Sequence, residues 1–167
     1  MNSSTAASVC IRKVTAADKE EWLRLRHMLW PNLTKERLLA DRDALIELAD
    51  CAPIFVAALN DGSLCGMAEF SLRQVAAGCE SSPIAYVDGW YVDDEWRGEG
   101  IGRMLIEKGE AWALGQGCTE MASDTTSKYP GSTEAHAALG FEPVGPSINF
   151  RKWLRAVQAI PSESGLI

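Results

Sequence analysis

The sequence lacks the features that would assign it to a membrane, an export route or a nucleic acid. No stretch approaches the roughly 18 consecutive apolar residues of a membrane-spanning helix. The first ten residues hold no basic segment followed by an apolar run, so we do not expect a secretory signal peptide. Lysine and arginine form no cluster, and the net charge is -7. We therefore expect neither a membrane nor a nucleic acid as a partner.

Cysteine and histidine are too few and too scattered for a disulfide framework or a metal site. The five cysteines include no C-x-x-C pair, and the two histidines, His27 and His136, lie in no metal-binding motif. Reduced thiols of this kind are typical of cytoplasmic proteins. We expect a cytoplasmic protein with no bound metal.

The chain has the composition of a globular protein. Apolar residues make up 47% of it, enough for one buried core, and 167 residues suggest a single domain. We expect the core to span about residues 9–154, with flexible tails at 1–8 and 156–167.

Apolar periodicity and turn residues predict an α/β fold with one sheet. The strands are predicted at Ser8–Val14, Ile54–Leu59, Ser63–Val75, Pro83–Val92, Cys118–Asp124 and Val144–Leu154. The helices are predicted after Thr15 (with Trp22, Leu25 and Leu29 on one face), after Thr34 (with Leu38, Leu45, Leu48 and Ala49), at about Glu99–Leu114 and at Ser132–Leu139. This order implies a mixed, mostly antiparallel sheet flanked by about four helices.

A glycine-rich loop, Arg97-Gly98-Glu99-Gly100-Ile101-Gly102, lies between a predicted strand and a predicted helix. Helix N-termini present free N–H groups that suit phosphates, and glycine lets a phosphate approach the backbone. The Walker pattern fails because Arg103 and Met104 follow Gly102. The dinucleotide fingerprint would need glycine at position 103 and a shorter distance from the strand. A simple turn remains an alternative.

The loop resembles the pyrophosphate-binding motif of the GCN5-related N-acetyltransferase family. Downstream, AHAALGFEPVG (Ala135–Gly145) resembles the short last helix of that family, and the resemblance extends over about Val9–Leu154. The segments Leu25–Pro31, Ser81–Val92, Cys118–Thr125 and HAALGF together resemble the aminoglycoside 6′-N-acetyltransferase branch.

The resemblance implies a GCN5-related acetyltransferase domain in which two splayed parallel strands bind acetyl-CoA. It implies direct transfer of acetyl from acetyl-CoA to the 6′-amino group of an aminoglycoside, in a homodimer. Another small amine or a protein N-terminus is an alternative acceptor. A non-catalytic acyl-CoA-binding module is an alternative of a different class.

Three residues are candidates for binding the aminoglycoside. Asp88 lies within an apolar strand, where a carboxylate needs a partner, and it could hold an ammonium and accept its proton. Asp124 ends a strand at the edge where α/β sheets bind ligands, and Trp30 follows the first helix, where its ring could cover a sugar. Each also has a structural alternative: an ion pair, a helix cap and core packing. Glu69 is a weaker third carboxylate, interpreted as lying on a solvated face.

His136 occupies the position at which many family members place a tyrosine that protonates the leaving thiolate, and histidine can donate a proton near neutral pH. Packing within the helix is the alternative for it. Tyr129 stands where the family often has an asparagine beside the cofactor. The resemblance also implies a set of cofactor-binding residues: Trp90, Tyr91, Val92, Arg97, Gly98, Glu99, Gly100, Ile101, Gly102, Arg103 and Tyr129.

Overall fold

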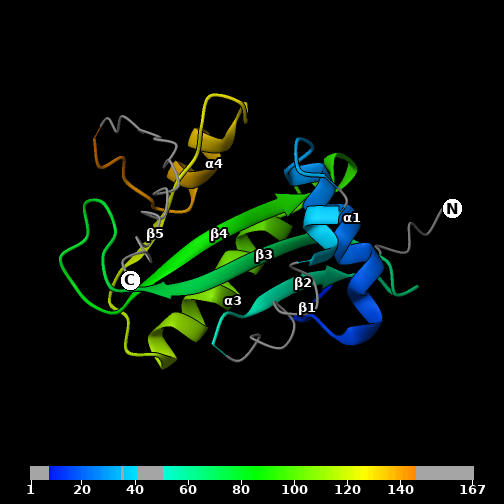
Figure 1. Cartoon of the computed structure of the whole chain (residues 1–167), viewed down its shortest axis with the longest axis horizontal. Coiled ribbons are helices and arrows are strands. Elements are labelled where there is room, and N and C mark those ends of the chain that lie inside the picture. The colour runs from blue at the N-terminus through cyan, green and yellow to red at the C-terminus, as the bar shows by residue number, and fades with distance from the viewer. Residues whose placement is uncertain (1–7, 35, 41–50, 146–167) are drawn as a thin grey trace, which may run out of the picture.

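The computed structural model of the chain describes residues 8–34, 36–40 and 51–145. It contains one five-stranded sheet in the order β1-β2-β3-β4-β5 (Figure 1). The strands are β1 (Cys10–Lys13), β2 (Ile54–Ala58), β3 (Leu64–Arg73), β4 (Ile84–Val92) and β5 (Met121–Ser123). Strands β1 to β4 pair antiparallel, whereas β4 and β5 pair parallel. The prediction of a mixed, mostly antiparallel sheet is confirmed.

Helices cover both faces of this sheet. They are α1 (Lys19–Leu29), α3 (Ile101–Gly115) and α4 (Ser132–Ala138), with 3₁₀ turns η1 (Ala16–Asp18) and η2 (Asp94–Trp96). In Figure 1, α1 lies on one face, α3 on the opposite face, and α4 beside β5. Among the described residues, no helix is long and apolar enough to cross a membrane.

The predicted helix after Thr34 is described only in part. Residues 36–40 are helical, Leu38 is buried, and the Thr34 hydroxyl accepts a hydrogen bond from the Arg37 N–H at 3.3 Å. Leu45, Leu48 and Ala49 lie outside the described residues, as does most of the predicted strand over 144–154.

Strand β2 is buried on both faces because its residues alternate between two layers of core. Ile54, Val56 and Ala58 belong to a cluster that contains Trp22 and Leu25 of α1. Phe55 and Ala57 belong to the opposite cluster, together with Ile101, Leu105 and Ile106 of α3. The predicted inward face of α1 is therefore confirmed at Trp22 and Leu25.

Gly109 allows α3 to approach the sheet closely. A β-carbon at this position would lie 2.1 Å from Cζ of Phe70, whose side chain is 2% exposed. We expect Gly109→Ala to lower the free energy of unfolding by about 1–3 kcal/mol through overpacking, an effect larger than the roughly 1 kcal/mol of helix propensity gained.

Gly115→Ala is the matched control for Gly109→Ala, because its β-carbon would meet nothing within 4 Å at the end of the same helix. This control should unfold at the same or a higher urea concentration than the wild type. Urea denaturation followed by circular dichroism compares the two variants. Equal midpoints for both would contradict the packing described for Gly109.

The two parallel strands separate part-way along β4. They pair only between Ala85–Val87 and Met121–Ser123, after which β4 continues to Val92 without β5 but still paired with β3. On its other edge, β4 carries a β-bulge: Phe70 pairs with Val87 and Glu69 with Gly89, so Asp88 has no partner in β3. A bulge re-aims the side chain of the extra residue. The predicted splay is confirmed, and Asp88 lies next to it.

Candidate active site

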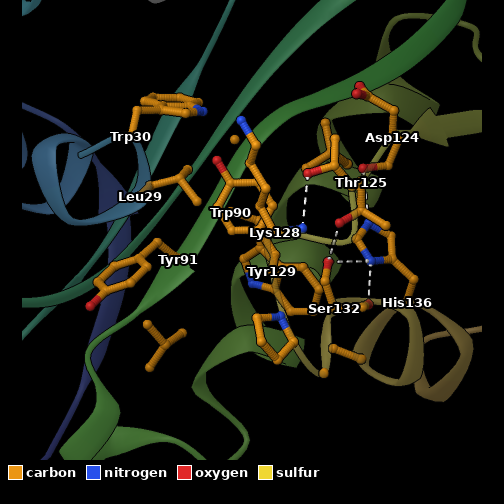
Figure 2. Close-up of a pocket in the computed structure, with 18 of the residues that line it drawn as sticks. Leu29, Trp30, Trp90, Tyr91, Asp124, Thr125, Lys128, Tyr129, Ser132 and His136 are labelled. Carbon is orange, nitrogen blue, oxygen red and sulfur yellow. Dashed lines mark hydrogen bonds between the residues drawn. The ribbon is translucent and has the colours of Figure 1, made fainter. Parts of the chain in front are cut away.

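A cleft of about 620 Å³ lies where β4 and β5 separate. Its walls come from the end of α1, the last half of β4, the segment after β5, and α4. Figure 2 shows Trp30 and Leu29 on one side and Asp124, Ser132 and His136 on the other. The cleft brings together nine of the residues predicted from the sequence: Trp30, Asp88, Trp90, Tyr91, Val92, Arg97, Asp124, Tyr129 and His136.

Both predicted acceptor carboxylates are held by other side chains. Arg73 donates a hydrogen bond to Oδ1 of Asp88 at 2.8 Å, and its guanidinium carbon lies 3.1 Å from the centroid of the Tyr86 ring. The hydroxyl of Tyr86 donates to Oδ1 of Asp124 at 2.5 Å. Asp88 and Asp124 thus belong to one network, which fixes the positions of two negative charges at the same cleft.

The Tyr86 hydroxyl is expected to ionise late. Burial, and then the hydrogen bond to Asp124, raise the pKa of Tyr86 from its usual value of 10.0 to about 12. Because the folded state keeps this proton longer than the unfolded state, stability is full below about pH 10 and is lost as the pH rises towards about 12. The difference in phenolate absorbance between the wild type and Tyr86→Phe should therefore develop near pH 12. A difference that develops near pH 10 would contradict this burial of Tyr86 and its hydrogen bond to Asp124.

His136 is half-buried, and the surrounding side chains and backbone fix its orientation. Nδ1 lies 2.7 Å from the carbonyl oxygen of Ser132, and Nε2 lies 3.0 Å from Oγ of Ser123. The rings of Trp90 and Phe141 meet the imidazole edge-on, with centroids at 5.6 and 5.3 Å. The ring is therefore held by both nitrogens and by aromatic contacts.

The side of the cleft that contains Trp30 packs against a buried ion pair of Glu69 and Arg26. Glu69 is only 7% exposed, accepts a hydrogen bond from Nε1 of Trp22 at 2.9 Å, and lies 3.1 Å from Nε of Arg26. The Arg26 guanidinium lies 5.2 and 5.1 Å from the ring centroids of Trp22 and Trp30. The interpretation of Glu69 as a solvated residue is wrong, because α1 covers this face of β3. Trp30 itself packs so close to Gly89 that a β-carbon there would lie 2.6 Å from its ring.

The glycine loop adjoins the cleft and lines it only through Arg97. Gly98 and Gly100 adopt φ angles of 84° and 79°, in the left-handed region that favours glycine, and a β-carbon at either would meet nothing within 4 Å. The first hydrogen bond of α3 runs from the Met104 N–H to the Gly100 carbonyl, so the preceding N–H groups point out of the helix end. Gly102 places this end against Trp90, since a β-carbon there would lie 2.7 Å from the indole. The loop is open to an anion beside the cleft.

The side chains predicted around the cofactor have partners of their own. Arg103 donates to the carbonyl of Ala138 at 2.8 Å, at the end of α4. Arg97 pairs with Asp94 at 2.8 Å and donates to the Val92 carbonyl at 3.0 Å. Ile101 is 2% exposed, so only its backbone can face a ligand, and Glu99 is exposed. The backbone of the loop is therefore better placed for a diphosphate than these side chains.

The sequence predictions missed two residues that line the cleft, Ser123 and Lys128, and two that hold its carboxylates, Arg73 and Tyr86. The spacing of Tyr86 and Asp88, two residues apart on one strand, was a usable signal. Ser123 and Lys128 carried no such signal because their positions depend on how β5 and the following loop meet α4. Among the described residues, no group of three His, Cys, Asp or Glu side chains could hold a metal ion.

The sequence profile of the acetyltransferase (GNAT) family matches residues 22–141, which contain β2 to β5 and all the residues that line the cleft. The chain belongs to the GNAT family. The predicted resemblance to GCN5-related acetyltransferases is confirmed.

Among GNAT proteins, the chain is similar to several named for one substrate class. It is 38% identical over 148 residues to aminoglycoside N(6')-acetyltransferase type 1 of Klebsiella aerogenes, covering 87% of this chain and 97% of that protein. It is 40% identical over 152 residues to the protein of that name from Stenotrophomonas maltophilia, covering 87% and 94%.

A solved structure of AAC(6')-Iy with the bisubstrate analog CoA-S-monomethyl-acetylneamine matches this GNAT fold with a TM-score of 0.81. It is 35% identical in sequence, and the match covers 89% of this chain and 100% of that one. A structure of AAC(6')-Iy in complex with CoA gives a TM-score of 0.82 at 34% identity, covering 89% and 97%.

Proposed function

We propose that this chain transfers the acetyl group of acetyl-CoA to the 6′-amino group of aminoglycosides. The observation that carries the proposal is the cleft in which the separating parallel strands meet two fixed carboxylates, Asp88 and Asp124. Relatives of similar length are named for this activity, and the AAC(6')-Iy complex joins the two substrates in one molecule.

The described residues fit acetyl-CoA at two places. The glycine loop offers backbone N–H groups and the positive end of α3 to a diphosphate, without a β-carbon in the way. From Asp88 to Val92, β4 has an edge that β5 does not pair with, and the backbone there can bond an extended pantetheine arm. Bound acetyl-CoA supplies the activated acetyl group as a thioester.

The acceptor side of the cleft suits a polycation. Asp88 and Asp124 are each held through Oδ1, which leaves the second carboxylate oxygen of each to accept hydrogen bonds from an ammonium group. Trp30 presents an aromatic wall to the same cleft, where it can cover a sugar ring. Two fixed negative charges match an acceptor that carries several amino groups.

The chemistry requires an unprotonated amine and a protonated leaving sulfur. Asp88, or a water molecule that it orders, accepts the proton of the attacking amine, while His136 is the source of the proton that the thiolate finally receives. Alignment of the amine with the thioester removes an entropic barrier of roughly 7 kcal/mol or more in favourable cases. Positioning by the cleft walls therefore contributes a large part of the rate.

Release of free thiol from acetyl-CoA tests this function. We expect turnover with kanamycin-type or gentamicin-type amines, and the product should carry the acetyl group on the 6′ nitrogen by NMR. Spermidine and a peptide with a free N-terminus serve as control amines. Faster release of thiol with a control amine would show that aminoglycosides are not the preferred acceptor. Binding of acetyl-CoA without release of thiol would indicate a non-catalytic binding module.

We also propose that the protein works as a homodimer in the cytoplasm. The dimer is supported by the family resemblance, and the location by five cysteines that all carry free thiols. Light scattering measures the mass in solution: a value near twice 18.2 kDa is expected, and a monomer at all concentrations would contradict the dimer.

A further inference from the structure

We infer that the hydroxyl of Ser123, rather than the imidazole of His136, delivers the proton to the departing sulfur of coenzyme A. In this inference, which rests on the proposed acetyl transfer, His136 is the proton source behind Ser123. Ser123 is then a catalytic residue, and His136 acts through it.

Both ring nitrogens of His136 already have partners. A carbonyl oxygen only accepts hydrogen bonds, so Nδ1, at 2.7 Å from the Ser132 carbonyl, carries a proton. Nε2 is directed at Oγ of Ser123 at 3.0 Å. The aromatic rings of Trp90 and Phe141 contact the imidazole from the side. A proton that leaves Nε2 along its hydrogen bond reaches Ser123 first.

Ser123 stands where the cleft begins. It is the last residue of β5 and pairs with Val87, the last residue of β4 that β5 covers. Beyond this pair the strands separate, and Ser123 lines the cleft together with Asp88. The sulfur of a pantetheine arm laid along the open edge of β4 would end next to this position.

The protonation state of His136 sets the direction of the Ser123 hydroxyl. With a neutral ring, Nε2 can only accept, and the hydroxyl proton points at the ring. With a protonated ring, Nε2–H donates to Oγ, which turns the hydroxyl proton away from the ring and towards the cleft. The hydrogen-bonded pair is therefore ready to donate only when His136 carries the extra proton.

The proposed step balances. The amine nitrogen forms a bond to the acetyl carbon, the carbon–sulfur bond breaks, and the electron pair of that bond goes to sulfur. Sulfur takes the hydroxyl proton of Ser123, and Oγ takes the proton of Nε2 from His136. The proton released by the amine goes to Asp88 or to water. Exchange with solvent then returns a proton to His136.

A double-mutant cycle with Ser123→Ala and His136→Asn tests the relay. Each single variant should lower kcat by roughly tenfold to 10²-fold, the lower part of the range for general acid catalysis, while KM for the aminoglycoside and Kd for acetyl-CoA stay unchanged. Groups that act as one unit give non-additive losses in kcat, so the kcat of the double variant should equal that of the slower single variant. The solvent deuterium isotope effect on kcat should decrease in all three variants. Ser123→Thr, which keeps a hydroxyl, should recover part of kcat.

Some results would overturn the relay alone, and one would overturn the proposed function as well. Losses that multiply in the double variant, or a kcat of Ser123→Ala equal to that of the wild type, would overturn the relay while leaving acetyl transfer intact. So would a Ser123→Thr variant that folds, binds acetyl-CoA normally and is as slow as Ser123→Ala. A wild type that acetylates no aminoglycoside would overturn the proposed function and the relay together.

Discussion

Asp88→Asn is expected to lower kcat/KM for aminoglycosides by about 10²-fold or more, the range over which positioned acid–base groups act. Asparagine preserves the shape of the side chain but can neither accept the amine proton nor attract an ammonium by charge. The Kd for acetyl-CoA should not change, because the predicted coenzyme contacts along β4 use backbone groups, which the substitution leaves in place, and the others lie at α3. Steady-state kinetics with saturating acetyl-CoA, together with calorimetry, measure both quantities.

Arg73→Met separates this role of Asp88 from a structural one. The pair between Arg73 and Asp88 is partly exposed, with side chains 42% and 32% accessible, and such pairs contribute only about 0–1 kcal/mol to stability. If Asp88 served only as the partner of Arg73, both substitutions would cost the same activity. We expect Arg73→Met to lose far less than Asp88→Asn, and equal losses would refute the role assigned to Asp88.

Gly100→Val is expected to weaken acetyl-CoA binding by at least about tenfold, a loss of about 1.4 kcal/mol. Gly100 adopts a φ of 79° directly before α3, and a β-branched residue is strained in that region. The substitution should therefore rotate the backbone N–H groups of the loop and place methyl groups where the diphosphate approaches. Calorimetry with CoA measures the change.

Gly117→Val is the matched control at the opposite end of α3. Gly117 has a φ of 81°, and its β-carbon would also meet nothing within 4 Å, so the strain is similar while no ligand is predicted nearby. Both variants should lose stability to a similar extent, of the order of 1–2 kcal/mol, and only Gly100→Val should lose affinity for CoA. Equal CoA affinities in the two variants would remove the glycine loop from the binding site.

The fold followed from sequence patterns because its signals are local. Hairpin punctuation at Asn60–Gly62, the apolar run of β2 and the turn before α3 each lie within a short window, and each predicts the element that is observed. The glycine loop and the HAALGF segment indicated the protein family.

The partners of individual side chains did not follow, because long-range packing sets them. Glu69 was assigned to solvent, since nothing near it in the sequence shows that Trp22, 47 residues earlier, would cover it. The bulge that re-aims Asp88 depends on the register with β3. Likewise, Arg103, one of the cofactor-binding residues implied by the resemblance, donates to the Ala138 carbonyl, 35 residues away, a contact that no local pattern indicated.

The candidate site therefore divides into two kinds of residue. His136 was predicted from its position in a motif and Asp88 from its place in an apolar strand, whereas the contacts of Ser123 and Tyr86 became visible only once β4, β5 and α4 were placed together. A motif thus locates a site, while the geometry of neighbouring strands shows which atom can act.

The proposed binding of the acetyl-CoA diphosphate at the α3 N-terminus is tested most directly by NMR titration of the ¹⁵N-labelled chain. The two ligands are CoA and pantetheine, which lacks the diphosphate. CoA should shift the backbone amides of Gly98, Gly100 and Gly102 as well as those of Trp90–Val92. Pantetheine should shift only the β4 amides. If saturating CoA leaves the three glycine amides unmoved while other regions respond, the coenzyme binds elsewhere and the account is wrong.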